Sequence, residues 1–534
     1  MRSQCLPFTQ IPHTTRLFKD FLFWTPEVSN FYPRPPQIKD WLSDQVSSLK
    51  YEVERRARVS DVLEKQNRAW NASAKTIQNI AKFRGGAAAM VTGQQVGLFG
   101  GPLFAIFKAL TAIKLANEAQ EMGFNCVPVF WLATIDHDLE EVNQVQLLGA
   151  EASLRKFSVP VNAVADAPVG TIAFGSEMET ALQGVSEILG DSEAVSLLRE
   201  TYRPDETFGS AFGRLLLRMF AEHGVIVLNA ADPKVQKIAL PVYRAAAEQA
   251  GQLNAALQER GRELEAAGYH QQVKVTATSS PLFTLRDGAR VPVHITDDDF
   301  VVIGQKIPRS ELIAQIESSP ELFSANVLLR PVVQDYLLPT VAYVGGSAEV
   351  AYFAQAAVLY KRILGRATPI FPRFSATIVE PKQQSLLQKY GLSLLDIFQG
   401  SESVRQKLAE HTLPGELQAA FEQGASTLSK SMARIQEALG RLDKTLVEAA
   451  ENAGSKIEHQ LEQLRARAAR AELRHQEVLG RHAELLSNTL YPNKVLQERE
   501  ISGVYFLAKY GAGLISDLLN AINVECVDHQ IVSL

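Results

Sequence analysis

The amino-acid sequence predicts an α/β fold with a long helical arm, and three observations indicate it. A buried strand, a glycine-rich loop, a helix and a second buried strand follow one another between residues 87 and 134, which is the order of a βαβ unit. The order of strand, glycines and helix returns at residues 340–353. Apolar residues then recur at alternating spacings of three and four between residues 414 and 486, which predicts a coiled coil.

The bulk properties limit the classes of protein. At 534 residues the chain exceeds the usual domain of about 100–200 residues, so we expect one large α/β body and a separable module. The net charge of −5 argues against a nucleic-acid partner, since such proteins usually carry a basic surface. The sequence has no apolar run of about 18 residues and no signal-peptide pattern at its start. We therefore expect no membrane association and a cytoplasmic location.

The three cysteines, Cys5, Cys126 and Cys526, lie far apart and form no CxxC or Cys/His motif. Such spacing is not typical of a disulfide framework or a structural zinc site. We therefore expect neither. Cys126 begins a predicted strand and should be buried and unreactive.

Residues 1–145 are predicted to form the first half of the core, after a helical N-terminal segment. The elements expected here are a strand at Ala87–Val91, a glycine-rich loop at Thr92–Gly101, a helix from Pro102 to about Glu121, and a strand at residues 126–134. Pro102 suits the first helical position, where its missing N–H costs nothing, and Gly123 can end the helix. The second strand is apolar throughout, as expected for a parallel strand covered on both faces.

Residues 146–310 are predicted to form an inserted α/β lobe, and residues 311–385 the second half of the core. The elements expected in the lobe are strands at Leu154–Val159, Val225–Leu228 and Val273–Ala277, and helices at Phe208–His223 and Val235–Ala266. Residues 281–306 alternate apolar and polar side chains between Asp-Gly and Asp-Asp-Asp turns, which predicts a β-meander.

Residues 386–490 are predicted to form a helical coiled-coil arm that serves packing or dimerisation rather than chemistry. Its apolar seam comprises Leu428, Met432, Ile435, Leu439, Leu442 and Leu446. Asn452-Ala453-Gly454 interrupts the seam before it resumes at Ile457, so we expect two antiparallel helices joined at that interruption. Residues 491–534, with a helix at Gly503–Leu519 and a strand at Gln530–Leu534, should pack back on the core.

The first candidate binding element is the glycine-rich segment Thr92–Gly101. Gly93, Gly97 and Gly100 allow a ligand to approach the backbone closely, and the following helix N-terminus favours a phosphate or carboxylate. Gln94 and Gln95 add amide donors, and Lys108 can supply a cation. The segment matches neither a Walker A motif nor GxGxxG, and its alternative role is a tight turn without a ligand.

The second candidate is Asp136-His137-Asp138, directly after an apolar strand. In a doubly wound sheet this position lies at the crevice where ligands bind. Flanking carboxylates favour the protonated form of His137, which suits it to act as an acid or base or to stabilise charge on a transferring phosphoryl group. The alternative is that Asp136 or Asp138 caps the next helix, and the two roles are compatible.

Two further segments repeat this placement. Gly345 and Gly346 follow a strand and precede a helix on which Glu349 and Tyr352 lie one turn apart; Glu349 suits an amine or a ribose hydroxyl, and the alternative is a glycine turn with a capping serine. Arg373, followed by Ser375, can clamp a phosphate or form a surface turn. Arg330 lies in a mixed polar and apolar stretch that suits a pocket wall.

Four segments carry a resemblance to a known family: VTGQQVGLFGGPLFAIFKALTAIKLA, PVFWLATIDHDLEEVN, LLRPVVQDYLLPTVAYVGGSAEVAYFAQ and FPRFSATIVE. In the same order and over almost the whole chain, they resemble the bacillithiol biosynthesis cysteine-adding enzymes. The resemblance implies a Rossmann-like nucleotidyltransferase core with inserted connecting-peptide lobes, and a C-terminal antiparallel coiled coil that supports a homodimer. It implies a ligase that adds L-cysteine to the amino group of glucosaminyl-malate, with ATP or a related adenine nucleotide, which Mg²⁺ can accompany.

Together the patterns and the resemblance predict three sets of site residues and no protein metal ligand. The predicted catalytic residues are Asp136, His137, Asp138 and Arg373. The predicted nucleotide-binding residues are Thr92, Gly93, Gln94, Gln95, Gly97, Gly100, Gly345, Gly346 and Ser375. The predicted substrate-binding residues are Lys108, Arg330, Glu349 and Tyr352. The sequence departs from the family pattern at Ile135, where an acid is common, and at Ser347-Ala348, where Pro-Gly is common.

Two functions of other classes stay open at this point. A nucleotide-binding oxidoreductase is one, because Rossmann-like sheets serve many chemistries; the missing GxGxxG, with an acid about 20 residues further on, counts against it. A non-catalytic coiled-coil scaffold is the other, but it leaves the glycine and Asp-His-Asp clusters at strand ends unexplained.

Overall fold

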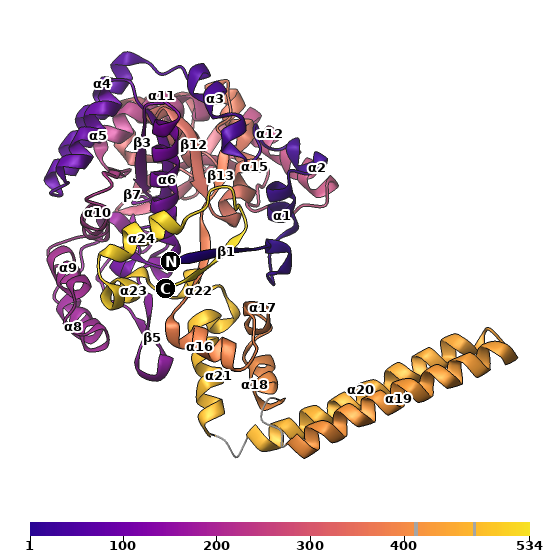
Figure 1. The fold of residues 1–534 in the computed structure, drawn as a ribbon. Coiled ribbons are helices and arrows are strands. Elements are labelled where there is room, and N and C mark those ends of the chain that lie inside the picture. Colours follow the sequence, from indigo (N-terminus) through magenta and orange to yellow (C-terminus); the bar gives the residue numbers. More distant parts are fainter. Residues whose placement is uncertain (411–414, 474–476) are drawn as a thin grey trace. The chain divides into compact units, whose positions relative to one another are not determined.

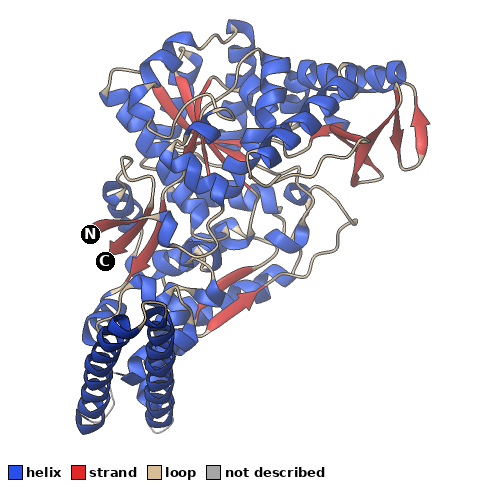
Figure 2. Cartoon of the chain, turned by 90° about the vertical axis from the view of Figure 1, so that its right-hand side faces the viewer, coloured by secondary structure: helices blue, strands red, loops and turns tan. Residues whose placement is uncertain are grey.

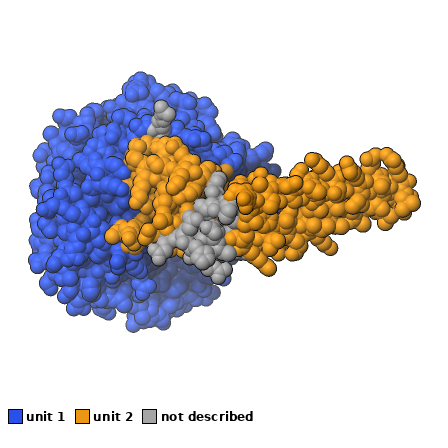
Figure 3. Space-filling view, turned by 60° about the horizontal axis from the view of Figure 1, so that its bottom comes forward, with its two compact units in different colours: residues 1–148, 154–378, 497–532 blue, residues 149–153, 379–496, 533–534 orange. Residues whose placement is uncertain are grey.

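The computed structural model describes residues 1–410, 415–473 and 477–534. The chain divides into two compact units (Figure 3). Unit 1 comprises residues 1–148, 154–378 and 497–532, and unit 2 comprises residues 149–153, 379–496 and 533–534. In the part of the chain that the structure describes, no helix is long and apolar enough to span a membrane.

The core of unit 1 is a five-stranded parallel sheet of order β13-β12-β2-β3-β6. Its strands are β2 (Ala88–Gln94), β3 (Cys126–Leu132), β6 (Ile226–Asn229), β12 (Thr340–Gly345) and β13 (Ile370–Pro372). All seven residues of β3 are buried, as the apolar run predicts. Successive strands run outward from β2 in one direction and from β12 in the other, so the topological switch point lies between β2 and β12.

The predicted βαβ unit is confirmed as β2, α6 (Phe104–Glu121) and β3. Two of its boundaries differ from the prediction. Strand β2 continues to Gln94, and α6 begins two residues after Pro102 rather than at it. Contacts with the C-terminal segment account for the later helix start. Pro102 forms a β-bridge with Ser502, and the N–H of Leu103 donates to the carbonyl of Ile501 at 2.9 Å. Gly123 has a φ of +87° and follows the helix end, as predicted.

Helices surround the core strands (Figures 1 and 2). The helix that directly follows β12 is α15 (Ser347–Leu364). The other principal helices of unit 1 are α1 (Arg16–Phe23), α3 (Leu42–Ser48), α4 (Val53–Ala69), α5 (Ala74–Arg84), α8 (Glu177–Leu189), α9 (Glu193–Thr201), α10 (Phe208–Met219), α11 (Pro233–Glu248), α12 (Ala250–Ala266), α13 (Arg309–Ser318) and α14 (Arg330–Leu337).

The predicted meander is confirmed as part of a second, antiparallel sheet of order β10-β9-β8-β7-β11. Its strands are β7 (Ser279–Arg286), β8 (Ala289–Thr296), β9 (Asp299–Val302), β10 (Gln305–Ile307) and β11 (Phe323–Ala325). The strand predicted at Val273–Ala277 is wrong. The side-chain amide of Gln355 bonds the backbone N–H and C=O of Val273, at 2.9 and 2.8 Å, which takes the place of a strand partner. Strand β6, from the segment predicted as an insertion, pairs with β3 in the core sheet.

A third sheet of order β1-β15-β14 contains β1 (Arg2–Leu6), β14 (Ser375–Val379) and β15 (His529–Ser533). Contrary to the expectation from spacing, Cys5 and Cys526 form a disulfide. Pairing of β1 with β15 brings these residues together across 521 positions of sequence, a distance that no local pattern reveals. Cys126 is free and buried, as predicted.

The helix predicted at Gly503–Leu519 is two helices, α23 (Gly503–Tyr510) and α24 (Gly513–Ala521). Gly511 ends the first with a φ of +76° and a ψ of 178°, a positive-φ conformation that glycine adopts more readily than other residues. A short two-stranded sheet, β4 (Val145–Leu148) with β5 (Leu154–Phe157), completes the strands of unit 1.

Unit 2 carries the predicted helical hairpin, α19 (Gly415–Leu442) and α20 (Leu446–Leu473) (Figure 1). The turn lies at residues 443–445, not at Asn452–Gly454 as predicted. Asp443 forms it by accepting bonds from the N–H and the hydroxyl of Thr445, both at 2.8 Å. Gly454 lies inside α20, where a Cβ would stand 3.4 Å from the Met432 side chain, so the glycine permits close helix packing.

The remaining helices of unit 2 are α16 (Pro381–Lys389), α17 (Leu394–Ile397), α18 (Ser401–Glu410) and α21 (Glu477–Leu490). The predicted arm also includes residues 411–414 and 474–476, which lie outside the described residues.

Candidate active site

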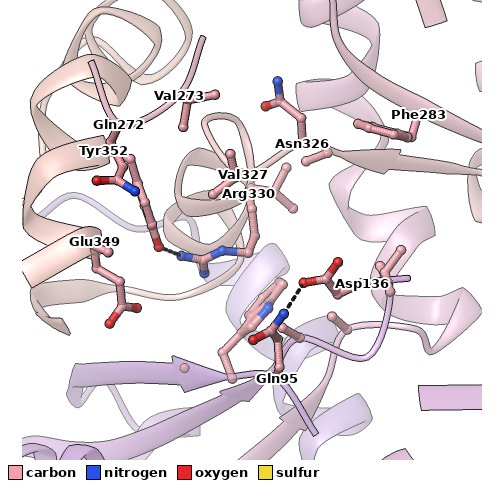
Figure 4. Close-up of a pocket in the computed structure, with 18 of the residues that line it drawn as sticks. Gln95, Asp136, Gln272, Val273, Phe283, Asn326, Val327, Arg330, Glu349 and Tyr352 are labelled. Carbon is pink, nitrogen blue, oxygen red and sulfur yellow. Dashed lines mark hydrogen bonds between the residues drawn. The ribbon is translucent and has the colours of Figure 1, made fainter. Parts of the chain in front are cut away.

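Unit 1 contains a cavity of about 740 Å³ at the carboxyl ends of the central strands (Figure 4). The end of β2, the segment after β3 and the start of α15 all line it, and the antiparallel sheet contributes a further wall. The volume is typical of a small-molecule site. Its position, between β2 and β12, is where doubly wound sheets bind their ligands.

Lys108 and Glu349 form a largely buried ion pair in the cavity wall at this switch point, with 5% and 14% of their side chains exposed. Lys108 Nζ lies 2.6 Å from Glu349 Oε2 and donates to the Gly93 carbonyl and to Gln94 Oε1, both at 2.8 Å. Burial lowers the pKa of Lys108, although Glu349 opposes that shift. Burial alone would raise the pKa of Glu349, but Lys108 and neighbouring donors outweigh it and hold the pKa low. The carboxylate therefore stays charged.

Arg330, from α14, lies beside this pair. It donates to the Tyr352 hydroxyl at 2.8 Å (Figure 4) and to Gln334 Oε1 at 3.0 Å. Burial opposes its charge, but Tyr352, Tyr343 and Glu349 prevail and raise the pKa of Arg330. Burial also raises the pKa of Tyr352 to about 12, so its hydroxyl remains protonated near neutral pH. The predicted residues Arg330, Glu349 and Tyr352 thus share one wall.

Gln95 joins the first glycine segment to the Asp-His-Asp segment. Its Nε2 donates to Asp136 Oδ2 (Figure 4) and to Glu141 Oε2, both at 2.8 Å. Asp138 does not line this cavity. It accepts the Glu141 N–H at 3.0 Å and caps the short helix α7 (Leu139–Val142), which is the alternative that the sequence left open.

The His137 ring contacts a cation, which the sequence did not predict. The expectation was an imidazolium between two carboxylates. Instead Arg290 NH1 lies 2.8 Å from His137 Nδ1, whereas Asp136 Oδ1 is 3.7 Å from it and accepts the His137 backbone N–H. Asp138 is turned to its helix cap. A guanidinium only donates, so this contact requires an acceptor at Nδ1.

Arg373 lines the cavity and is fixed from behind by a buried carboxylate. Its NH2 lies 2.6 Å from Glu498 Oε1, which also accepts the Ser375 hydroxyl at 2.9 Å. His529 Nδ1 is 2.8 Å from the same hydroxyl, and burial lowers the pKa of His529 to about 4. Ser375 therefore shares the Glu498 carboxylate with Arg373 and does not line the cavity; its contact with a nucleotide stays a prediction.

Three cations surround the ring of Phe104, the first residue of α6. Arg373, Lys108 and Arg499 lie 5.3, 5.8 and 5.9 Å from the ring centroid, measured from the guanidinium carbon or the ammonium nitrogen. All four residues line the cavity. Burial and the neighbouring Arg373 lower the pKa of Arg499. This cationic end can hold an anionic ligand such as a phosphate.

Besides Asp138 and Ser375, four more predicted site residues do not line the cavity: Thr92, Gly97, Gly100 and Gly345. The Thr92 hydroxyl donates to the Val344 carbonyl within the sheet at 2.9 Å. The Tyr202 hydroxyl donates to the Gly97 carbonyl at 3.2 Å and accepts the Gly100 N–H at 3.1 Å, so this half of the glycine segment packs against Tyr202. A Cβ at Gly345 would lie 2.9 Å from the side chains of Glu349 and Ile370.

Most of the predicted site residues do line the cavity. They are Gly93, Gln94, Gln95, Lys108, Asp136, His137, Arg330, Gly346, Glu349, Tyr352 and Arg373. Sequence reasoning missed Phe104, Arg290 and Arg499 in the wall, and Glu498 behind it. No spacing rule connects these residues to the site, although the LQERE segment with two of them is an unusually charged stretch near the C-terminus. Among the described residues, no group of three or more His, Cys, Asp or Glu side chains is placed to hold a metal ion.

Comparisons with known proteins agree along the whole chain. Residues 1–374 match the model of the bacillithiol biosynthesis BshC N-terminal Rossmann-like domain, and residues 376–534 match that of the BshC C-terminal coiled-coil domain. A Koribacter versatilis protein named as a cysteine ligase, BshC, is 47% identical over 532 residues, and one from Solibacter usitatus with the same name is 35% identical over 536 residues; each alignment covers 100% of both chains.

A solved structure named as an arginyl-tRNA synthetase, from Campylobacter jejuni, is 10% identical with a TM-score of 0.23, covering 81% of this chain and 92% of that one. A score this low does not establish a shared fold.

Proposed function

The chain belongs to the bacillithiol biosynthesis BshC family, and from that membership we propose that it is a ligase that adds L-cysteine to the amino group of glucosaminyl-malate, forming bacillithiol. The observation that carries the proposal is a cavity at the switch point of a Rossmann-like sheet, with a cationic end around Phe104 and carboxylates at Asp136, Glu141 and Glu349. An anionic cosubstrate and two amines can bind in such a cavity.

The chemistry requires activation of the cysteine carboxylate, because carboxylates do not acylate amines unaided at neutral pH. In the proposed first step a carboxylate oxygen attacks a phosphorus of ATP and displaces pyrophosphate or ADP. The substrate amine then attacks the acyl carbon, the C–O bond breaks, and AMP or phosphate leaves with the original carboxylate oxygen. The amine proton is lost to solvent or to a base.

The residues present fit a bound nucleotide. Lys108, Arg373 and Arg499 converge on one end of the cavity, where cations stabilise the charge of transferring phosphates. Gly93 lines the same cavity and lets β2 lie close to β3, since a Cβ there would stand 3.0 Å from the Trp131 carbonyl oxygen. Mg²⁺ is proposed to enter with the nucleotide phosphates, because protein ligands for it are few in such sites.

We place the cysteine ammonium at Asp136 and Glu141 rather than at Glu349. Both oxygens of Glu349 already accept bonds: the Tyr343 hydroxyl donates to Oε1 at 2.5 Å, and the Gly346 N–H donates to Oε2 at 2.8 Å beside Lys108. Asp136 and Glu141 share only the Gln95 amide as a common donor, which leaves acceptor capacity for an ammonium. Glu349 then orients Lys108 in the proposed mechanism.

The test is reconstitution. Purified protein with ATP, Mg²⁺, cysteine and glucosaminyl-malate should form a product with one free thiol and the mass of bacillithiol, and should consume one ATP for each product molecule. Omission of any one substrate should stop both the formation of product and the consumption of ATP. Failure to form product together with no consumption of ATP would contradict the ligase assignment.

A homodimer through the α19–α20 hairpin is part of the same proposal. Ile435, Leu442 and Leu464 leave 47%, 78% and 56% of their surface exposed in the single chain, and exposed apolar residues on a coiled coil favour a partner helix. Sedimentation equilibrium of the full chain should give twice the monomer mass of 58.8 kDa. Substitution of Leu442 and Leu464 by Glu should shift the mass to the monomer.

A further inference from the structure

The imidazole of His137 is held by a residue from a distant part of the chain. Arg290 NH1 lies 2.8 Å from His137 Nδ1 across a separation of 153 residues. His137 follows β3 of the core sheet, whereas Arg290 lies on β8 of the antiparallel sheet. The antiparallel sheet therefore adds a side chain to the segment that carries the predicted catalytic residues.

Arg290 is itself fixed in place. Its Nε donates to the Ser324 hydroxyl at 3.1 Å, its NH2 donates to the Ala325 carbonyl at 2.8 Å, and its guanidinium carbon lies 3.9 Å from the Phe283 ring centroid. Only 9% of its surface is exposed. Every nitrogen of the guanidinium has an assigned partner, so Arg290 cannot turn from His137 without breaking these contacts.

The chemistry of this contact decides the state of the ring. A guanidinium has five donors and no acceptor, so the contact requires a lone pair on His137 Nδ1. The imidazole is then neutral, with its proton on Nε2. The carboxylates that face His137 are Asp136, at 3.7 Å from Nδ1, and, around the smaller cavity that His137 also lines, Asp138, Glu140 and Asp166. They favour an imidazolium, but Arg290 occupies the hydrogen-bonding position.

We propose that Arg290 is a positioning residue that fixes His137 as the neutral Nε2–H tautomer, so that His137 donates a hydrogen bond to the reacting substrate and does not act as its general base. The inference rests on the proposed function for the identity of the reaction. As the carboxylate attacks phosphorus, or the amine attacks the acyl carbon, negative charge grows on a substrate oxygen. A neutral imidazole N–H stabilises such charge without transferring its proton.

The first test reads the tautomer and needs no substrate. Protein with ¹⁵N-labelled histidine is compared with His137→Gln, which identifies the His137 resonances by NMR. Near neutral pH, wild-type His137 should show a protonated Nε2 and an unprotonated Nδ1. Arg290→Met should convert His137 at the same pH to imidazolium or to a mixture of tautomers. Arg286→Met is the matched control: Arg286 lies on β7, donates to Gln315 at 2.8 Å and does not line the cavity, so its spectrum should match the wild type.

The second test reads the reaction. Arg290→Met should lower kcat by about 10²-fold, the typical effect of losing one positioned donor, with the KM for ATP changed less than about threefold. It should also move the acidic limb of the pH–rate profile, and Arg290→Lys, which retains the charge, should restore part of kcat. Arg286→Met should retain the wild-type kcat.

Three results would overturn the proposal. One is a wild-type His137 that is doubly protonated or protonated on Nδ1 near neutral pH. Another is a folded Arg290→Met variant whose His137 keeps the wild-type tautomer. The third is a tautomer that changes while kcat and the pH–rate profile do not. Absence of ligase turnover in the wild type contradicts the proposed function instead, and the NMR outcome separates the two failures because it is measured without substrate.

Discussion

Two carboxylates near the carboxyl end of the core sheet, Glu349 and Glu498, have partners of the same kinds but different positions. Glu349 accepts bonds from a hydroxyl and a backbone N–H and pairs with Lys108. Glu498 accepts bonds from the Ser375 hydroxyl and the Ala376 N–H and pairs with Arg373. Glu349 lines the cavity and Glu498 does not.

The difference teaches that burial and hydrogen bonding alone do not identify a functional residue. Lys108 can lose its proton when buried, and burial lowers its pKa, whereas an arginine stays charged in proteins. The first pair can therefore respond to a ligand, and the second provides a fixed cation. We expect substitutions at Glu349 to change activity and substitutions at Glu498 to change stability.

The largest expected effect is that of Glu349→Gln. The change removes the charge that orients Lys108 at the end of the cavity, so kcat/KM should fall by about 10³-fold. Lys108 keeps the Gly93 and Gln94 oxygens as acceptors and can deprotonate, which limits the loss of stability. Steady-state kinetics checks this prediction. A fall in kcat/KM of less than about threefold would contradict the functional role given to Glu349.

Glu498→Gln should lower the stability of the protein more than its activity. It leaves the Arg373 guanidinium, only 9% exposed as a residue, without its ion-pair partner, and breaking a buried pair costs about 3–5 kcal/mol of unfolding free energy. Urea denaturation of the two variants measures the contrast. The comparison is reversed if Glu349→Gln is the less stable variant and Glu498→Gln the less active one.

Stability should also depend on pH through His529. Burial lowers its pKa to about 4 from an unfolded value of about 6.5, so the unfolded state binds more protons between these pH values. The free energy of unfolding is therefore unaffected by His529 above pH about 6.5. It falls by about 3 kcal/mol as the pH is lowered from about 6.5 to about 4. Urea denaturation across this range should show the loss, and a folded His529→Gln variant should not lose stability by this route.

The smallest effect should follow Tyr202→Phe, which removes a hydroxyl bonded to Gly97 and Gly100. Loss of these hydrogen bonds should cost about 1–2 kcal/mol of unfolding free energy and leave kcat/KM unchanged, because this half of the glycine segment lies outside the cavity wall. Gln95→Ala, in the other half, is the contrasting variant and should lower kcat/KM by about tenfold or more. Equal kinetic effects of the two variants would show that the two halves act alike.

Local patterns predicted the parts of the molecule that local physics determines. The βαβ unit, the meander and the positions of Lys108 and Glu349 follow from apolar periodicity, glycines and strand ends. The site's remaining parts depend on tertiary contacts. Arg290 reaches His137 across 153 residues, and Cys5 bonds Cys526 across 521; neither separation leaves a pattern in the sequence.

The errors have the same origin. Val273 failed to form a strand because a glutamine side chain satisfies its backbone. The sequence predicts the hairpin turn at Asn452–Gly454, but Asp443 and Thr445 form it directly after α19 ends at Leu442, and Gly454 packs against Met432. In both cases a contact with a specific side chain outweighed the expectation from residue type.

The most direct test of the central proposal, activation of the cysteine carboxylate in this cavity, is an oxygen-transfer measurement. Cysteine labelled with ¹⁸O in its carboxylate is incubated with the protein, ATP, Mg²⁺ and glucosaminyl-malate, and the nucleotide and phosphate products are analysed by mass spectrometry. One ¹⁸O atom should appear in AMP or in phosphate for each thiol product formed. Product formation without ¹⁸O in either would contradict the proposal.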